Sequence, residues 1–400
     1  MSASRGRTLI LVENLSVPFD RRVWQEATSL RAAGYDVSVI CPQGPMRDTE
    51  SHAVIDGVSI HRYPLRAAGK RMGSYVREYA SALSHTTALV RRLSKSAPFD
   101  VIHACNPPDA LLLTALSQRR HGAALVFDHH DLVPELFVSR FDRRGPLLKA
   151  TYLAERAAFH LADVVISTND SYRRVALHRG KKRPEDVFVV RSAPDSGRFS
   201  PVAPDPSLRR SKPHLLAYLG VMGPQDGVDH ALRALARLGE SRRDWHAVFI
   251  GSGDVLEEMQ CLAVELDLGE VVEFTGRVPD EDVIRILSTA DVCLAPDPKN
   301  PLNDVSTMNK VVEYMALARP IVSYDLRESR VSAAGAALYA APNDIDDFAR
   351  CIDELLDDPG RRAAMGVAGR HRVEEELSWA RSEEQLLAAY QRAMAHRRER

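Results

Sequence analysis

Short apolar runs alternate with segments of helical period along almost the whole chain, and this rhythm limits the possible folds more than any other feature. The runs span residues 8–12, 37–41, 101–105, 124–127 and 164–167 in the first half, and 215–219, 247–250, 271–274, 292–295 and 320–323 in the second. Continuous apolar runs of this length, each followed by a helix, are typical of buried parallel strands. The sequence therefore predicts an α/β protein with two doubly wound, Rossmann-like parallel sheets.

A proline-rich break separates the two sets of runs. It contains four prolines in a short polar stretch: Pro201, Pro204, Pro206 and Pro213. Linkers between domains commonly have this composition, and 400 residues exceed the size that one core usually reaches. We expect a first domain at 1–200, a second domain at 201–378, and a C-terminal helix at 379–400 that packs back on the first domain.

The two halves carry opposite charge although the formal net charge is only −1. Residues 1–200 hold 29 basic and 20 acidic side chains, and residues 201–400 hold 24 and 34. The balanced total argues against a nucleic-acid partner. Basic side chains in the first half surround the apolar segment Pro146–Leu148 or form clusters elsewhere: Arg140, Arg143, Arg144, Lys149, Arg91, Arg92 and 181–183. This arrangement fits either an anionic, membrane-bound acceptor or a solvated surface that the acidic half compensates.

The five cysteines are scattered and show no zinc-ligand spacing, which favours a reduced, cytoplasmic compartment. No stretch of about 18 apolar residues is present, and the N-terminus lacks a cleavable signal pattern. We expect a cytoplasmic protein that can attach to the inner face of the membrane.

In the first domain, the loop after the first strand lacks the glycine pattern of a dinucleotide fold, which argues against an NAD or FAD oxidoreductase. This loop ends in Asp20, Arg21 and Arg22, which either cap a helix and face solvent or bind an anionic acceptor. Residues 127–135 bring two histidines and three carboxylates together after a strand, and we expect His130 and Asp131 to take part in catalysis.

In the second domain, three glycine loops follow three successive strands. Glycines there let a phosphate approach the backbone at a helix N-terminus, so these loops predict a nucleotide site. The candidate residues are Gly220, Val221, Met222, Gly223, Gly251, Gly276, Arg277 and Val278.

The segment 303–316 is the densest cluster of functional side chains. Ser306 or Thr307 is expected to cap a helix whose first turn carries Asn309 and Lys310. The backbone N–H groups of that turn, the helix dipole and the ammonium group of Lys310 would then all favour a bound anion. Glu313 follows one turn later, where it can accept hydrogen bonds from a ribose. The alternative is a buried amphipathic helix with a solvated Glu313. Two acidic triplets, at 280–282 and 344–346, are expected to open helices rather than to bind a metal.

Four of these segments resemble the retaining glycosyltransferases of family 4, which have the GT-B fold. They read PFDRRVWQEA, DHHDLVPELF, LGVMGPQDGVD and NKVVEYMALARPIV, the last within the S-x-x-N-K-x-x-E-Y-M-A form of the donor block. The resemblance implies two Rossmann-like domains facing a cleft. It also implies transfer of a hexose, with retention, from a nucleotide-diphosphate sugar on the second domain to a glycan or polyprenyl-linked acceptor on the first. No metal or other cofactor is implied, and cell-surface polysaccharide or glycoconjugate synthesis is the expected setting.

By position, Glu313 matches the second Glu of the family's E-x7-E motif, which is expected on the donor ribose. His130 and Asp131 match the family's HD beside the donor sugar, and 276–278 match the segment around the base. The first Glu of the motif is replaced by Val305, and its sugar contacts are expected to pass to Asp304 or Asn303. The basic residues of the family's glycine loop are replaced by Val221 and Asp226, so Lys310 is expected to supply the countercharge.

Two other functions fit the same residues. A sugar-nucleotide epimerase of this fold would convert a nucleotide sugar without an acceptor. A non-catalytic nucleotide-sugar-binding protein would bind the donor only, as the missing acid at Val305 allows.

Overall fold

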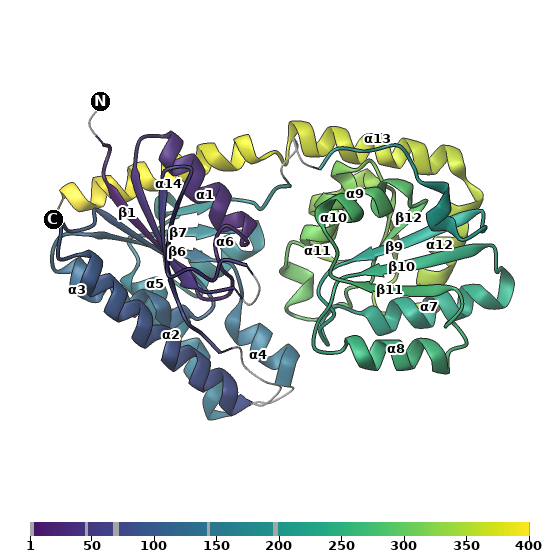
Figure 1. The fold of residues 1–400 in the computed structure, drawn as a ribbon, viewed down its shortest axis with the longest axis horizontal. Coiled ribbons are helices and arrows are strands. Elements are labelled where there is room, and N and C mark those ends of the chain that lie inside the picture. The colour runs from purple at the N-terminus through teal and green to yellow at the C-terminus, as the bar shows by residue number, and fades with distance from the viewer. Residues whose placement is uncertain (1–3, 45–46, 67–71, 142–144, 195–198, 400) are drawn as a thin grey trace. The chain divides into compact units, whose positions relative to one another are not determined.

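The computed structural model of the chain describes residues 4–44, 47–66, 72–141, 145–194 and 199–399. Arg143 and Arg144 lie outside these residues, whereas the four prolines of the predicted break lie within them. The chain forms two compact units (Figure 1). The first contains Met1–Ser192 and Ala380–Arg400, and the second contains Ala193–Trp379. The boundary between the units lies after Ser192, whereas the sequence predicted it after residue 200, at the proline-rich break.

The first unit is built on a sheet with the strand order β3-β4-β2-β1-β5-β6-β7-β8, parallel except for the β3–β4 pair. Its strands are β1 (Arg7–Leu11), β2 (Asp36–Pro42), β3 (His52–Ile55), β4 (Val58–Tyr63), β5 (Val101–Cys105), β6 (Ala124–His129), β7 (Val164–Ser167) and β8 (Val187–Val189). Its helices are α1 (Arg21–Ala32), α2 (Met72–Leu93), α3 (Leu116–Arg119), α4 (Val133–Phe141), α5 (Pro146–Leu161), α6 (Asp170–His178) and α14 (Trp379–Arg398).

The second unit has an all-parallel sheet with the order β11-β10-β9-β12-β13-β14. Its strands are β9 (His214–Leu219), β10 (Trp245–Ile250), β11 (Val272–Gly276), β12 (Val292–Ala295), β13 (Ile321–Tyr324) and β14 (Ala337–Ala340). Its helices are α7 (Val228–Ser241), α8 (Leu256–Glu265), α9 (Asp280–Thr289), α10 (Asn309–Ala316), α11 (Arg327–Ala333), α12 (Ile345–Asp357) and α13 (Pro359–Glu375). Two Rossmann-like sheets are therefore present, as the apolar runs predicted.

The apolar runs form the strands because they are buried on both faces, and the helices bury a single stripe. In α1 that stripe contains Val23, Ala27 and Leu30, all fully buried. The β3–β4 hairpin was not predicted from the sequence, because β3 alternates exposed and half-buried residues instead of forming an apolar run. β8 and β14 are short and only partly buried, and they were missed for the same reason.

Helix α14 packs on the first unit through polar contacts along its length. Ser382 donates to the carbonyl of Arg191 at 2.8 Å, Arg392 and His396 both contact Asp186 at 2.8 Å, and Arg397 pairs with Asp100 at 2.7 Å. None of the helices within the described ranges combines the length and apolar character needed to cross a bilayer.

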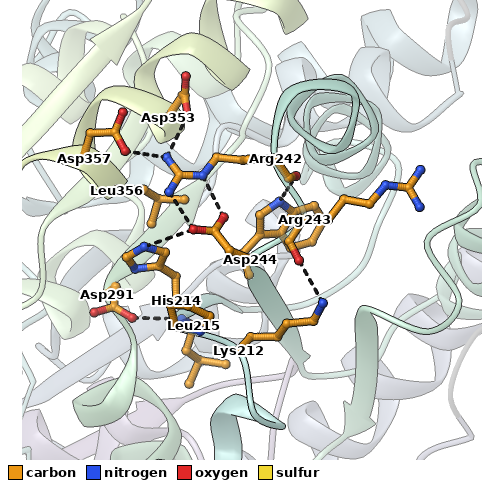
Figure 2. A network of polar contacts seen from close by, with 12 residues as sticks. Lys212, His214, Leu215, Arg242, Arg243, Asp244, Asp291, Asp353, Leu356 and Asp357 are labelled. Carbon is orange, nitrogen blue, oxygen red and sulfur yellow. Dashed lines mark hydrogen bonds and ion pairs between the residues drawn. The ribbon is translucent and has the colours of Figure 1, made fainter.

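A network of polar contacts lies at the amino-terminal edge of the second sheet (Figure 2). The guanidinium of Arg242 binds three carboxylates at 2.7–2.9 Å, those of Asp244, Asp353 and Asp357. Asp244 precedes β10, and Asp291 accepts a hydrogen bond from the first part of β9 at Leu215, 2.8 Å away. These charges lie at the edge where parallel α/β sheets do not bind ligands.

Candidate functional site

In each sheet, chemistry is expected at the carboxyl ends of the strands, where the strand order reverses. In the first sheet this position lies between β1 and β5, and in the second between β9 and β12. The structure places a buried charged cluster at both positions. We describe the two clusters separately.

The cluster of the first unit is centred on Arg22, at the start of α1. Its Nη2 atom lies 3.1 Å from Oδ1 of Asp128 and 3.1 Å from Oε1 of Glu26. Its Nε atom lies 2.8 Å from Nε2 of His130, and its Nη1 atom donates to the carbonyl of Val190 at 2.8 Å. The two acids are fully buried, so the guanidinium compensates charge that water cannot reach.

The two acids take opposite protonation states. Burial and the neighbouring Asp128 raise the pKa of Glu26 well above its usual value, which keeps its carboxyl group protonated. Burial alone would also raise the pKa of Asp128, but Arg22 and His130 outweigh it and hold that pKa well below its usual value. Two carboxyl groups around one cation therefore hold one proton and one negative charge.

His130 and Asp131 follow β6 directly and are held by Asn106, which follows β5. The amide oxygen of Asn106 accepts from the backbone N–H groups of His130 at 2.6 Å and Asp131 at 3.0 Å. Its amide nitrogen donates to the carbonyl of Asp131 at 2.7 Å. The Asn106 side chain therefore fixes the backbone of both predicted catalytic residues.

The predicted loop at 127–135 begins later than the sequence indicated, because Asp128 and His129 belong to β6. Within the loop, the imidazole of His130 points to Asp128, with Nε2 and Oδ2 2.5 Å apart. Burial raises the pKa of Asp131. The structure thus brings His130 and Asp131 to one strand edge.

The residues predicted to bind the acceptor have internal partners. Asp20 caps α1 by accepting from the backbone N–H of Val23 at 3.1 Å, which is the structural alternative considered for it. The nitrogen atoms of Arg22 contact the buried cluster and the carbonyl of Val190, which follows β8. The expectation that Arg22 holds an anionic acceptor directly is therefore corrected. Arg21 is exposed at the start of the same helix.

Four side chains of this cluster, Glu26, Cys105, Asp128 and His130, offer ligand atoms within 4.8 Å of one another. They do not fit a cation as they stand, because the guanidinium of Arg22 already lies between the two acids. The thiol of Cys105 is also kept protonated, since burial raises its pKa well above the usual value. Arg22 supplies the positive charge that a metal would bring.

The three glycine loops of the second unit lie side by side. The N–H of Gly220 donates to the carbonyl of Ile250 at 3.0 Å, and that of Gly251 donates to the carbonyl of Gly276 at 2.9 Å. A Cβ atom on Gly251 would lie 1.9 Å from the carbonyl oxygen of Gly220, so only glycine permits this approach. The predicted grouping of the loops at one sheet edge is therefore present.

Several loop amides already donate within the protein, which changes the predicted phosphate site. Met222 N–H donates to the carbonyl of Ser252 at 3.2 Å, and Gly223 N–H donates to Oδ2 of Asp226 at 2.9 Å. The Met222 side chain is fully buried in the hydrophobic core, so only the backbone of this residue is available to the predicted donor site. Val221 is exposed on the loop, and Arg277 is exposed after β11 with Val278 half-buried beside it.

Lys310 is the charged centre of the second cluster. Its Nζ lies 2.6 Å from Oδ1 of Asp297 and 5.0 Å from the centre of the Tyr218 ring. Asp297 follows β12 and is buried, and within the described residues its Oδ2 atom has no hydrogen-bond partner. Although burial opposes the charge, Asp297 and Asp226 raise the pKa of Lys310, so the ammonium stays protonated. It lies against the glycine loop, since a Cβ on Gly220 would be 3.3 Å from Lys310 Cε.

The predicted helix cap at Ser306 or Thr307 is wrong. Helix α10 begins at Asn309 with Met308 as its N-cap residue, and the Met308 side chain makes no cap hydrogen bond; the Ser306 hydroxyl donates to the carbonyl of Leu302 at 2.9 Å. The N–H groups of a first helical turn have no carbonyl partner within the helix, so those of α10 are candidates to meet a ligand. Asn309 is exposed on that turn, and Glu313 is half-buried one turn later.

The residues expected to replace the missing acid at Val305 also have structural contacts. Asn303 is buried and donates to the carbonyls of Gln225 and Pro298, both at 2.9 Å. Asp304 lies 3.3 Å from Lys299 and accepts from the backbone N–H of Arg327 at 3.0 Å. Neither contact points to a sugar-binding role.

Sequence reasoning did not select Asn106, His103, Asp128, Glu26 or Asp297 as site residues. Each is a polar side chain in or directly after an apolar strand, or on the buried stripe of α1. Burial of such a group requires a partner, so the signal was a polar residue at a core position.

Two family models together match most of the chain. Residues 20–193 match the model "Glycosyl transferase 4-like domain", and residues 201–372 match "Glycosyl transferases group 1". The first model begins after β1 and covers the other strands of the first sheet, and the second model covers all strands of the second sheet.

Curated relatives are glycosyltransferases and related synthases. The GDP-mannose-dependent monoacylated alpha-(1-6)-phosphatidylinositol monomannoside mannosyltransferase of Corynebacterium glutamicum is 33% identical over 200 residues, 47% of this chain and 51% of that protein. The 2-deoxystreptamine glucosyltransferase of Streptomyces kanamyceticus is 26% identical over 46% of this chain and 47% of that protein. The chain thus matches about half the length of each of these relatives.

Solved structures share the fold over nearly the whole chain. Sucrose-phosphate synthase from Thermosynechococcus elongatus superposes with a TM-score of 0.79 at 18% identity, covering 98% of this chain and 100% of that one. Anabaena Alr3699/HepE in complex with UDP-glucose superposes with a TM-score of 0.73 at 14% identity, covering 96% and 99%. The fold shared with these proteins and the two domain matches support placing the chain in a family of GT-B glycosyltransferases.

Proposed function

We propose that the protein is a retaining hexosyltransferase that uses a nucleotide-diphosphate sugar. In the reaction, the bond between the sugar C1 atom and the diphosphate oxygen breaks, and a bond from C1 to an acceptor hydroxyl oxygen forms on the same face. The hydroxyl proton leaves with the diphosphate or passes to a base. The nucleoside diphosphate is the second product.

The observation that carries this proposal is the placement of charge at the strand-order reversals of both sheets. In the second unit Lys310 belongs to the first turn of α10, and its buried ammonium group lies against the loop at Gly220. In the first unit the cluster of Arg22, Asp128 and His130 occupies the corresponding edge. An ammonium and free helix amides stabilise the charge that develops on a leaving diphosphate.

We assign the donor to the second unit. Lys310 and the first turn of α10 meet the diphosphate, so a divalent metal is not required for charge compensation. Glu313 accepts hydrogen bonds from the ribose hydroxyls, and Arg277 and Val278 border the base. Two similar proteins support this assignment: the Corynebacterium mannosyltransferase depends on GDP-mannose, and the Anabaena protein was solved in complex with UDP-glucose.

We assign the acceptor to the first unit, where His130 and Asp131 handle the acceptor hydroxyl and its proton. A glycan or polyprenyl-linked acceptor of cell-surface polysaccharide or glycoconjugate synthesis suits the exposed face of α5. That face shows Lys149, Leu153 and Arg156 to solvent, while the helix's one acid, Glu155, is buried against Arg179. Basic and apolar side chains on one helix face favour an anionic membrane surface, here the cytoplasmic one.

A nucleotide-sugar panel tests the function. We expect UDP-glucose, GDP-mannose or a related sugar nucleotide to raise the thermal midpoint of the protein, because a ligand of the folded state stabilises it. With an acceptor mixture, the wild type should release nucleoside diphosphate, and Glu313→Ala and Lys310→Ala should remain folded without doing so. Wild-type turnover by both variants would contradict the donor assignment.

The same panel separates the two alternatives. Conversion of a sugar nucleotide without any acceptor would identify an epimerase. Binding of a donor without hydrolysis or transfer, across all acceptors, would identify a binding protein. Proton NMR of the first product formed, read at the anomeric position, distinguishes retention from inversion.

A further inference from the structure

We propose that helix α14 is a working part of the first-unit site, because Tyr390 and His103 position His130 through Asp128. The proposal rests on the role of His130 in the proposed function. The four side chains lie in contact one after another from the C-terminal helix to the loop after β6; Tyr390, His103 and Asp128 are buried and His130 is half-buried. Tyr390 and His103 are positioning residues in this scheme, since neither reaches the substrate.

The chain begins at Tyr390, which is fully buried. Its hydroxyl oxygen lies 3.1 Å from Nδ1 of His103, a residue in the middle of β5. Burial raises the pKa of the Tyr390 hydroxyl well above its usual value and lowers the pKa of His103, so the phenol keeps its proton and the imidazole is neutral. The other ring nitrogen, Nε2, faces the ionised Asp128 at 3.2 Å, which favours the ring proton on Nε2; Nδ1 then accepts from the Tyr390 hydroxyl.

That proton faces carboxyl groups. Nε2 of His103 lies 3.2 Å from Oδ2 of Asp128 and 3.8 Å from Oε2 of Glu26. Glu26 is the protonated acid of the pair, so the negative charge that His103 faces is that of Asp128. An N–H group in this position favours the ionised form of Asp128, whereas a ring lone pair would favour its protonation.

Asp128 in turn determines which ring nitrogen of His130 carries the proton. Nε2 of His130 lies 2.5 Å from Oδ2 of Asp128 and 2.8 Å from Nε of Arg22. These two contacts need opposite states of the nitrogen: a proton to donate to Asp128, or a lone pair to accept from Arg22. An ionised Asp128 selects the proton on Nε2. Nδ1 of His130 is then left for the substrate, since the side-chain hydrogen bonds of His130 to the described residues all use Nε2.

The Tyr390 hydroxyl is not needed to hold α14 in place. The helix is anchored separately at Ser382, Arg392, His396 and Arg397. The Tyr390 ring also packs edge-on against Tyr35, with centroids 5.3 Å apart, and this contact survives loss of the hydroxyl. Tyr390→Phe therefore removes the hydrogen bond to His103 and leaves the helix docked.

A matched control exists in the second unit. Tyr324 is fully buried, and its hydroxyl lies 3.0 Å from Nδ1 of His230. Tyr324→Phe removes the same kind of bond at a position remote in sequence from the chain described above. Both variants should lose similar stability, since a buried hydrogen bond contributes about 1 kcal/mol.

The decisive readout is the tautomer of His130, measured by NMR on protein labelled with nitrogen-15 in histidine and assigned with His130→Gln. We expect the wild type and Tyr324→Phe to carry the proton on Nε2, and Tyr390→Phe to shift His130 toward the Nδ1–H form. Asp128→Asn should shift it further if that variant folds. This readout needs no turnover, so it tests the chain even if the proposed function is wrong.

Turnover supplies the second readout. We expect Tyr390→Phe to lower kcat about 5-fold, the equivalent of one hydrogen bond, with an unchanged KM for the donor and a displaced pH profile of kcat. Tyr324→Phe should keep the wild-type kcat and profile. An Nδ1–H tautomer in the wild-type protein, or identical tautomer and kcat in the two Phe variants, would overturn the proposal.

Discussion

Each unit has a cluster in which one arginine binds several carboxyl groups, and the two clusters lie at opposite edges of their sheets. Arg22 binds Asp128 and Glu26 at the carboxyl edge of the first sheet, and both acids are 0% exposed. Arg242 binds Asp244, Asp353 and Asp357 at the amino edge of the second sheet (Figure 2), and the side chains of these acids are 38%, 44% and 72% exposed.

The sheet edge at which a cluster lies and the burial of its acids distinguish a reaction site from a network that only stabilises the fold. The exposed acids of the Arg242 network are partners of one cation, as on many protein surfaces. The buried Arg22 cluster includes a protonated acid, an ionised acid and two histidines, which a structural ion pair does not require. We therefore expect the first cluster to control the reaction and the second to contribute only stability.

The largest expected effect is at Asp128. Asp128→Asn removes the negative charge opposite buried Arg22 and should cost about 3–5 kcal/mol of unfolding free energy and most of the activity. Glu26→Gln replaces a carboxyl group that is already neutral, and it should change stability by less than about 1 kcal/mol. Urea unfolding of both variants measures the contrast. Equal losses would show that the two acids do not differ in protonation.

The second prediction concerns Lys310 and its partner. Lys310→Met leaves Asp297 buried without a countercharge, so it should cost about 3 kcal/mol and abolish stabilisation by the donor. Adding Asp297→Asn should restore much of the stability without restoring donor binding. Thermal shifts with and without sugar nucleotide separate the two effects. Donor binding by the double variant would remove Lys310 from the site.

The third prediction is a pH dependence that comes from Glu13, a buried residue directly after the β1 run. Burial, helped by the nearby Glu78, raises the pKa of Glu13 to about 8. Between the unfolded pKa near 4.5 and about 8 the folded state retains a proton that the unfolded state releases, so stability falls as pH rises. The slope should reach at most about 1.4 kcal/mol per pH unit.

Glu13→Gln is the matched variant for this effect, since it cannot titrate. Its unfolding free energy should vary less between pH 5 and 8 than that of the wild type, as about one proton fewer is linked to unfolding. The same dependence in both proteins would assign the titration to another group.

The smallest expected effect is at the exposed network. Hydrogen bonds from Arg242 lower the pKa of Asp244 to about 2. The stabilisation is therefore present above the ordinary Asp value and is lost as pH falls from about 4 toward 2. Because Asp244 is more than a third exposed, Asp244→Asn should cost only about 1 kcal/mol at pH 7. Its transfer rate should match the wild type; a slower rate would give this edge a part in the reaction.

Much of the fold was predictable because buried parallel strands have a direct signature in the sequence. The strand at Val101–Cys105 was predicted with its observed bounds, and the helix stripe of Val23, Ala27 and Leu30 was correct. The strands at His52–Ile55 and Val58–Tyr63 were not, because an edge hairpin that is half exposed lacks a continuous apolar run.

The site was predictable only in outline. His130, Asp131 and Lys310 were selected because titratable residues follow strands, and the three glycine loops were grouped correctly. The side-chain partners were not predictable: that Arg22 turns inward to Asp128, that Asn106 holds the loop, and that Ser306 does not cap α10 depend on contacts between distant segments. Periodicity and spacing carry no information about such pairs.

The most direct test of the central claim is one measurement on two matched variants, the rate of nucleoside diphosphate release by Arg22→Lys and Arg242→Lys. Lysine keeps the charge but loses the fork that reaches His130, so Arg22→Lys should slow the reaction about 100-fold through displacement of that side chain. Arg242→Lys should keep the wild-type rate. Equal rates in the two variants, fast or slow, would contradict the division of the two clusters into a reaction site and a stabilising network.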